Sequence, residues 1–168
     1  MSKVFGSKSI YAPVRSDKTR IIVSYEYQEE PDGENATWQE IVFYKKINPT
    51  VDKGTIKKAI LNDINQQTEE KIVTGLTWEG MNVWLSTENQ LNFKASYDRA
   101  VQKAGATLPV TFKIGEDAEG KPFYHTFDTM AEFEDFSDKI DEHRQACLTE
   151  GNQRKDAIDW TAYGIEEK

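Results

Sequence analysis

The fold is decided by residues 74–93, which read TGLTWEGMNVWLSTENQLNF. Gly75 follows a helical pattern and predicts the end of that helix, because glycine readily adopts the left-handed backbone that closes helices. Two short apolar runs, Leu76–Trp78 and Met81–Leu85, lie on either side of a Glu-Gly pair. They predict two short strands joined by a tight turn in which Gly80 takes a positive φ.

The end of the same stretch predicts the beginning of a second helix. Thr87 is expected to cap the free amides of its first turn, with Gln90 completing a capping box three residues later. Apolar residues then recur at helical spacing until Gly105 ends the helix. This predicted buried stripe consists of Phe93, Tyr97, Ala100, Val101 and Ala104.

Helical patterns also lie on both sides of this central part. Upstream, isoleucines at about fourfold spacing predict an amphipathic helix over residues 55–73: Ile56, Ile60, Ile64 and Ile72. Downstream, residues 108–114 and 122–127 predict a second hairpin. Thr129 and Glu132 then form a capping box for a helix that Gly151 is expected to interrupt. Its apolar face consists of Phe133, Phe136, Ile140, His143 and Cys147.

The N-terminal third predicts a further hairpin, because residues 21–27 alternate well and residues 37–45 are rich in strand-forming side chains. The first 20 residues hold five Lys or Arg and one acid, and they are expected to form a basic arm. The predicted fold is therefore α+β, with small antiparallel hairpins packed against three helices. The expected organisation is an arm over 1–19, a hairpin over 20–47, a compact domain over 55–160 and a tail over 161–168.

Composition excludes several classes of protein. The net charge is −8, and residues 115–168 hold fifteen acids against six basic residues, which disfavours nucleic-acid binding by the main body. No apolar run approaches the roughly 20 residues of a membrane-spanning helix. The first 20 residues lack the apolar stretch of a secretory signal, so no secretion signal is predicted.

The chain offers little catalytic or metal-binding chemistry. A single cysteine and two histidines exclude an internal disulfide and a Cys/His zinc site, and no cofactor is expected. His143 and Cys147 lie on one apolar helix face, which predicts a packed histidine and an unreactive buried thiol. His125 is expected on a strand, either exposed or in a cross-strand pair. We therefore predict no catalytic residue, no metal ligand and no enzymatic activity.

Trp38, Trp78 and Trp84 are the candidate recognition aromatics. Rings presented on strands can stack on sugar faces, but they can equally form the core of a small domain. Because the turn between Trp78 and Trp84 is short and the neighbouring helices need an apolar partner, the core interpretation is favoured for this pair.

The order of elements over residues 55–158 resembles a domain of unknown function found in tail-fibre-type proteins of bacteriophages and prophages. The similarity lies in an aromatic-glycine hairpin, a capped helix, a second β element and a closing helix. The residues that carry it are Trp78, Gly80, Val83, Ser86, Gln90, Asn92, Phe133, Phe136 and His143. The resemblance implies a non-enzymatic structural or accessory component of a phage.

Both ends of the chain carry apolar residues outside the periodic core, as segments that become ordered on a partner often do. The predicted assembly contacts are Val4, Phe5, Ile10, Tyr11, Trp160 and Tyr163. The expected partners are other virion or tail proteins, or further copies of this chain, with no membrane partner. The expected location is the virion, assembled in the host cytoplasm. The alternative is a module that recognises a host receptor or a surface glycan, through the hairpin over 20–45 or the one carrying Trp78 and Trp84.

Overall fold

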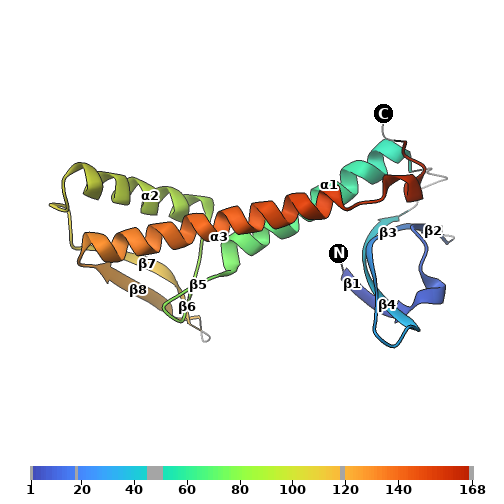
Figure 1. Ribbon diagram of the computed structural model, residues 1–168, viewed down its shortest axis with the longest axis horizontal. Coiled ribbons are helices and arrows are strands. Elements are labelled where there is room, and N and C mark those ends of the chain that lie inside the picture. The colour runs from blue at the N-terminus through green and yellow to red at the C-terminus, as the bar shows by residue number, and fades with distance from the viewer. Residues whose placement is uncertain (1, 18, 45–50, 118–119, 167–168) are drawn as a thin grey trace. The chain divides into compact units, whose positions relative to one another are not determined.

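The computed structural model describes residues 2–17, 19–44, 51–117 and 120–166 (Figure 1). The predicted α+β class is confirmed: three α-helices pack with small antiparallel sheets in the described part of the chain. The chain forms two compact units, unit 1 from Met1–Asn65 with Gln153–Lys168 and unit 2 from Gln66–Asn152. The elements of the N-terminal part are β1 (Ser2–Ser7), η1 (Lys8–Ile10), β2 (Val14–Ser16), β3 (Arg20–Glu29), β4 (Asn35–Tyr44) and α1 (Lys53–Thr74). They are followed by β5 (Leu76–Trp78), β6 (Met81–Val83), α2 (Thr87–Gln102), β7 (Val110–Glu116), β8 (Pro122–Phe127), α3 (Met130–Asp156) and η2 (Trp160–Tyr163).

Unit 1 contains a four-stranded antiparallel sheet with the order β1-β4-β3-β2. Its centre is the predicted N-terminal hairpin, in which Ile22 pairs with Val42. The connecting turn is held by Asp32, whose carboxylate accepts the amides of Glu34 and Asn35 at 2.9 Å each. Residues 45–47 of the predicted hairpin, and the linker as far as residue 50, lie outside the described residues.

The N-terminal segment differs from the arm that its charge suggested. Residues 2–7 form β1 along β4, and residues 14–16 form β2 along β3. Gly6 explains the close fit at β1, since a Cβ at this position would lie 3.1 Å from the ring of Trp38. The ring of Tyr11 then packs against the Trp38 ring at 5.7 Å between centroids. Basic residues therefore occur on strands of this segment, since Lys3 lies on β1 and Arg15 lies on β2.

The core of unit 1 lies between the sheet and the first half of α1. The predicted isoleucine stripe is confirmed, with Ile60 and Ile64 fully buried against Val23 and Tyr25. The C-terminal segment, expected to be a tail, also belongs to this core. Trp160 is buried there, and the hydroxyl of Tyr163 donates to the Ser24 carbonyl at 2.7 Å.

A strained position on β3 is fixed by the end of α3. Glu26 has a φ of 55°, a left-handed conformation that side chains rarely adopt, at a bulge in the pairing of β3 with β4. Arg154 donates to both carboxylate oxygens of Glu26, at 2.7 and 3.0 Å. This bidentate pair is well suited to holding the bulge in one geometry.

Unit 2 is built around a cluster of aromatic side chains. Residues of α2, α3 and the β7–β8 hairpin pack together, as in the ring contacts of Phe136 with Phe93 at 5.2 Å and with Phe127 at 5.0 Å. The tight turn of the β5–β6 hairpin is confirmed, with Gly80 at a φ of 79°. Val101, predicted to be buried on α2, is instead half exposed.

The caps of two helices differ in detail from the predicted ones. Ser86, not Thr87, caps α2, because its hydroxyl accepts the Asn89 amide at 3.2 Å. At α3, Thr129 accepts the amide of Glu132 as predicted, at 3.3 Å. The Glu132 carboxylate, however, accepts the Asp128 amide and also contacts His125 at 2.8 Å.

Gly151 does not interrupt α3, contrary to the prediction. A Cβ at Gly151 would lie 2.4 Å from the hydroxyl oxygen of Thr68 on α1, so the glycine allows the two helices to approach closely. In the part of the chain that the structure describes, no helix is both long and apolar enough to cross a membrane.

Candidate functional site

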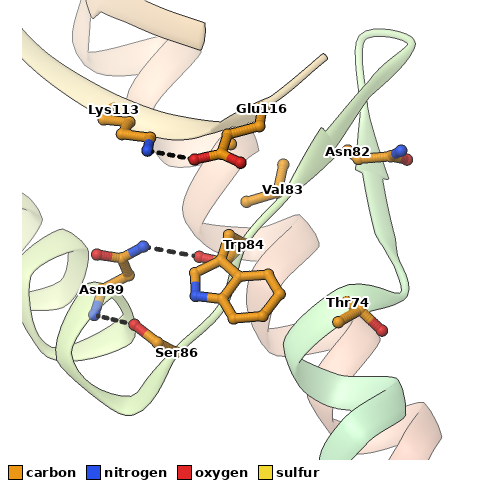
Figure 2. A pocket seen from close by; sticks show the side chains of 9 residues that line it. Thr74, Asn82, Val83, Trp84, Ser86, Asn89, Lys113 and Glu116 are labelled. Atoms are coloured by element: carbon orange, nitrogen blue, oxygen red, sulfur yellow. Dashed lines mark hydrogen bonds and ion pairs between the residues drawn. The ribbon is translucent and has the colours of Figure 1, made fainter. Parts of the chain in front are cut away.

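A hollow of about 580 Å³, lined by both polar and apolar surface, opens on unit 2 around the side chain of Trp84. Figure 2 shows the indole with Asn89 and Ser86 on one side, Asn82 and Thr74 on the other, and Lys113 with Glu116 above it. The hollow therefore collects one aromatic ring, two amides, two hydroxyls and one ion pair from elements that are separate in the sequence.

The floor of the hollow is a close approach of two backbone segments. A Cβ at Gly115 would lie only 2.0 Å from the carbonyl oxygen of Asn82, so only glycine allows β7 to come this near to β6. The amide of Trp84 donates to the Ile114 carbonyl at 2.8 Å, and the amide of Leu85 donates to the Val73 carbonyl at 2.8 Å. These bonds attach the segment after β6 to β7 on one side and to α1 on the other.

This attachment sets the direction of the Trp84 ring. Val83 and Leu85 are both fully buried in the core of unit 2, and Trp84 between them is 52% exposed. Side chains of an extended chain alternate between its two faces, so Trp84 must point away from the core that holds its neighbours. The core position favoured for Trp84 is therefore wrong.

Hydrogen bonds hold several of the polar groups around the ring. The amide nitrogen of Asn89 donates to the Trp84 carbonyl at 2.9 Å, while Thr77 donates to the Asn82 side chain at 3.4 Å. Lys113 and Glu116 form an ion pair at 2.6 Å, and both side chains are about half exposed. An exposed pair adds little stability, so both charges remain accessible to a ligand.

The other two candidate tryptophans are structural. Trp78 is buried, donates its indole N–H to Asp135 at 3.0 Å and meets the His125 ring edge-on. Trp38 is 1% exposed and donates its indole N–H to Glu40 at 2.7 Å. Neither ring offers a face to a ligand.

The six predicted assembly contacts divide into buried and exposed residues. Trp160 lies in the core of unit 1 and Tyr163 packs against that core, while Tyr11 is partly buried against the rings of Tyr27 and Trp38. Val4 on β1 is also partly buried. Phe5 and Ile10, by contrast, keep 65% and 57% of their surface exposed.

The single thiol sits beside a histidine without the features of a nucleophile. Cys147 lies 3.7 Å from Nε2 of His143, and that nitrogen is within 3.1 Å of the Lys71 carbonyl. Because a carbonyl accepts only from a protonated nitrogen, Nε2 serves as a donor and not as a base toward the thiol. The other ring nitrogen, Nδ1, lies 4.0 Å from the sulfur, at the outer limit of a hydrogen bond to sulfur. Burial raises the pKa of the Cys147 thiol, which disfavours the reactive thiolate. The packed role predicted for His143 agrees with these contacts.

A buried pair in unit 1 joins Tyr25 to Asp63. The Tyr25 hydroxyl donates to the Asp63 carboxylate. Burial, followed by this hydrogen bond, raises the pKa of Tyr25. The pair satisfies a carboxylate that is 2% exposed, which is a structural role. Over the described ranges, no group of three or more His, Cys, Asp or Glu side chains is arranged to hold a metal ion.

Fold and site together define an α+β protein with a hollow in which one aromatic ring lies among amides, hydroxyls and an ion pair. Over residues 55–167 the chain matches a domain of unknown function, DUF4376, and it belongs to this family. No curated protein sequence and no solved structure matches the chain. The match covers all of unit 2 and residues 55–65 and 153–167 of unit 1, and strands β1–β4 lie outside it.

Several residues that line the hollow were not predicted as site residues from the sequence: Thr74, Asn82, Asn89, Lys113 and Glu116. They lie on four separate elements, α1, β6, α2 and β7, and no sequence spacing links these elements. The alternation of Val83, Trp84 and Leu85 was the one local signal available. It indicates that the central residue faces away from its two neighbours.

Proposed function

We propose that this chain is a non-enzymatic structural or accessory protein of a bacteriophage virion, associated with the tail or a tail fibre. It acts through contacts with other virion proteins and reaches the particle during assembly in the host cytoplasm. The resemblance over residues 55–158 supports this proposal. The engaged His143 and the buried Cys147 are consistent with a protein that binds rather than catalyses.

The observation that carries the assembly role is the edge of the sheet at β1. Among the described residues, β1 pairs with β4 alone, so its other edge offers backbone amides and carbonyls to an added strand. Phe5 on this strand and Ile10 just after it expose most of their apolar surface. An open edge beside exposed apolar side chains is suited to strand addition by a partner.

Charge indicates the kind of partner strand. The first 20 residues carry four more basic than acidic groups, including Lys3 on β1 and Lys8 just after it. An acidic or neutral segment of another virion protein would complement this charge, whereas a basic one would be repelled.

Incorporation into phage particles tests the proposal. Particles are assembled with the wild-type chain, with Phe5→Lys or with Leu91→Lys, and the chain is quantified in purified virions by mass spectrometry. Leu91 is the matched control, because it is an apolar residue on α2 with 67% exposure, close to that of Phe5. Incorporation is expected to fall about tenfold for Phe5→Lys, the effect of roughly 1.4 kcal/mol, and to be unchanged for Leu91→Lys.

Two results would count against the proposal. Absence of the wild-type chain from purified particles contradicts a virion role, and normal incorporation of Phe5→Lys contradicts the β1 contact. Deleting residues 1–19 is a poorer test, because it removes both edge strands of the sheet.

A further inference from the structure

We propose that the hollow around Trp84 binds a neutral oligosaccharide, with the indole stacking on one sugar ring. The site is formed by residues of unit 2, whereas β1 belongs to unit 1, and the proposal does not depend on the assembly role. Four observations carry the proposal: the exposed ring, the polar groups beside it, the rigidity of their support and the balance of charge.

The exposed ring is the first observation. Trp38, Trp78 and Trp160 expose 6% or less of their surface, whereas Trp84 exposes about half. The aliphatic C–H face of a sugar ring can cover such an indole face, which removes apolar surface from water on both partners.

The polar groups around the ring match the hydroxyls of a sugar. The Asn89 amide uses its nitrogen to bond the Trp84 carbonyl, which leaves its oxygen as an acceptor toward a ligand. Asn82, Ser86 and Thr74 add further groups on the rim, as Figure 2 shows. Each of these groups makes a hydrogen bond within the protein and has further donor or acceptor capacity. Sugar hydroxyls can use that remaining capacity, whereas a wholly apolar ligand would remove it from water without a partner, which carries a desolvation penalty.

The support of the site is rigid, which favours binding by lowering the entropy lost. The backbone of Trp84 is bonded to Ile114, that of Leu85 is bonded to Val73, and Gly115 fixes the closest approach of the two strands. Ser86 caps α2 at the same point. The volume of about 580 Å³ lies within the range of roughly 300–1,000 Å³ found for small-molecule sites.

The charge balance selects neutral ligands. Lys113 and Glu116 are paired at 2.6 Å and both can exchange hydrogen bonds with hydroxyls. A phosphate-rich ligand such as nucleic acid would meet the carboxylate of Glu116 and a chain of net charge −8. A neutral sugar meets neither penalty.

Nuclear magnetic resonance on the full chain tests the proposal. The probes are neutral tetrasaccharides of glucose, galactose, N-acetylglucosamine and N-acetylgalactosamine, each added to about 10 mM, which detects even millimolar dissociation constants. The expected result is that at least one probe shifts the indole N–H signal of Trp84 together with side-chain signals of Asn82 and Asn89. The indole signals of Trp38 and Trp78 should not move, because both groups are buried and hydrogen-bonded.

Two variants complete the test. Trp84→Ala should weaken binding of the same probe about tenfold or more, the loss expected for a ring-stacking contact. Leu91→Ala, which removes an exposed side chain of α2 outside the hollow, should bind like the wild type. If Trp84→Ala does not fold, Asn82→Ala replaces it, with weaker binding expected.

Three outcomes would overturn the proposal. They are the absence of any shift with all four probes, shifts confined to residues outside the hollow, and unchanged binding by a folded Trp84→Ala. A proline-rich peptide that shifts the Trp84 signal where no sugar does would assign the hollow to a protein partner and would equally overturn it.

Discussion

Replacing Gly115 by alanine is expected to destabilise unit 2, because this glycine sets the distance between β6 and β7. Its φ lies outside the left-handed region, so the backbone itself tolerates alanine. The obstacle is steric: the new Cβ would lie 2.0 Å from the Asn82 carbonyl oxygen and 3.1 Å from its carbon.

The size of the effect follows from these distances. Ordinary contact begins at 3.4 Å, so the two segments must separate by roughly 1.4 Å. The bond from the Trp84 amide to the Ile114 carbonyl, now 2.8 Å, would then be broken, a net loss of about 1 kcal/mol. Overpacking strain adds about 1–3 kcal/mol, so the total loss of stability is about 2–4 kcal/mol.

Urea unfolding followed by circular dichroism measures this loss in the transition of unit 2. Glu116→Ala is the matched control, because it changes the adjacent, exposed residue of the same strand and should alter stability by no more than about 0.5 kcal/mol. Equal unfolding midpoints for Gly115→Ala and Glu116→Ala would refute the steric reasoning. Equal midpoints would also mean that the close approach of β6 and β7 at Gly115 does not hold the hollow rigid.

Three further predictions concern packing and the remaining polar contacts. Gly151→Ala should lower stability by about 1–2 kcal/mol, although alanine has the better helix propensity, because its Cβ clashes with Thr68. Thr68→Ala should relieve this clash. Additive effects of the two substitutions in a double-mutant cycle, measured by urea unfolding, would contradict the close contact between the helices. Cys147 should react with iodoacetamide far more slowly in the folded protein than in urea, because burial raises its pKa, and equal rates by mass spectrometry would contradict this. Glu26→Gln should cost about 1–3 kcal/mol in thermal unfolding, since it weakens the charged hydrogen bonds to Arg154, and Arg154→Lys should not preserve the bidentate contact.

Much of the fold could be predicted because its determinants are local. The isoleucine spacing of α1 and the aromatic spacing of α3 each set a helix face within a few turns. Gly80 likewise marked its turn by its own backbone freedom. A helix or a tight hairpin needs no information from the rest of the chain, so these patterns were sufficient.

The features that were missed depend on distant residues. β1 is a strand because it pairs with β4, and the charge of residues 1–20 gave no sign of that partner. Gly151 continues α3 because Thr68 leaves no room for a side chain, a fact that the sequence around the glycine does not contain. In both cases the local signal was correct in itself, and tertiary packing decided the outcome.

The exposure of Trp84 could not be predicted from its residue type, but it follows from the burial of its two neighbours. An indole is apolar enough to belong in a core, yet Val83 and Leu85 occupy the core positions and force the residue between them outward. A threonine or a lysine at this position would point the same way, because the direction comes from the backbone. The presence of a large ring in a hollow lined by amides and hydroxyls is therefore not explained by folding. For this reason Trp84→Ala should leave the stability of unit 2 within about 0.5 kcal/mol of the wild type while weakening the proposed sugar binding about tenfold or more. Trp78→Ala, which empties a buried aromatic position, should cost about 3–5 kcal/mol.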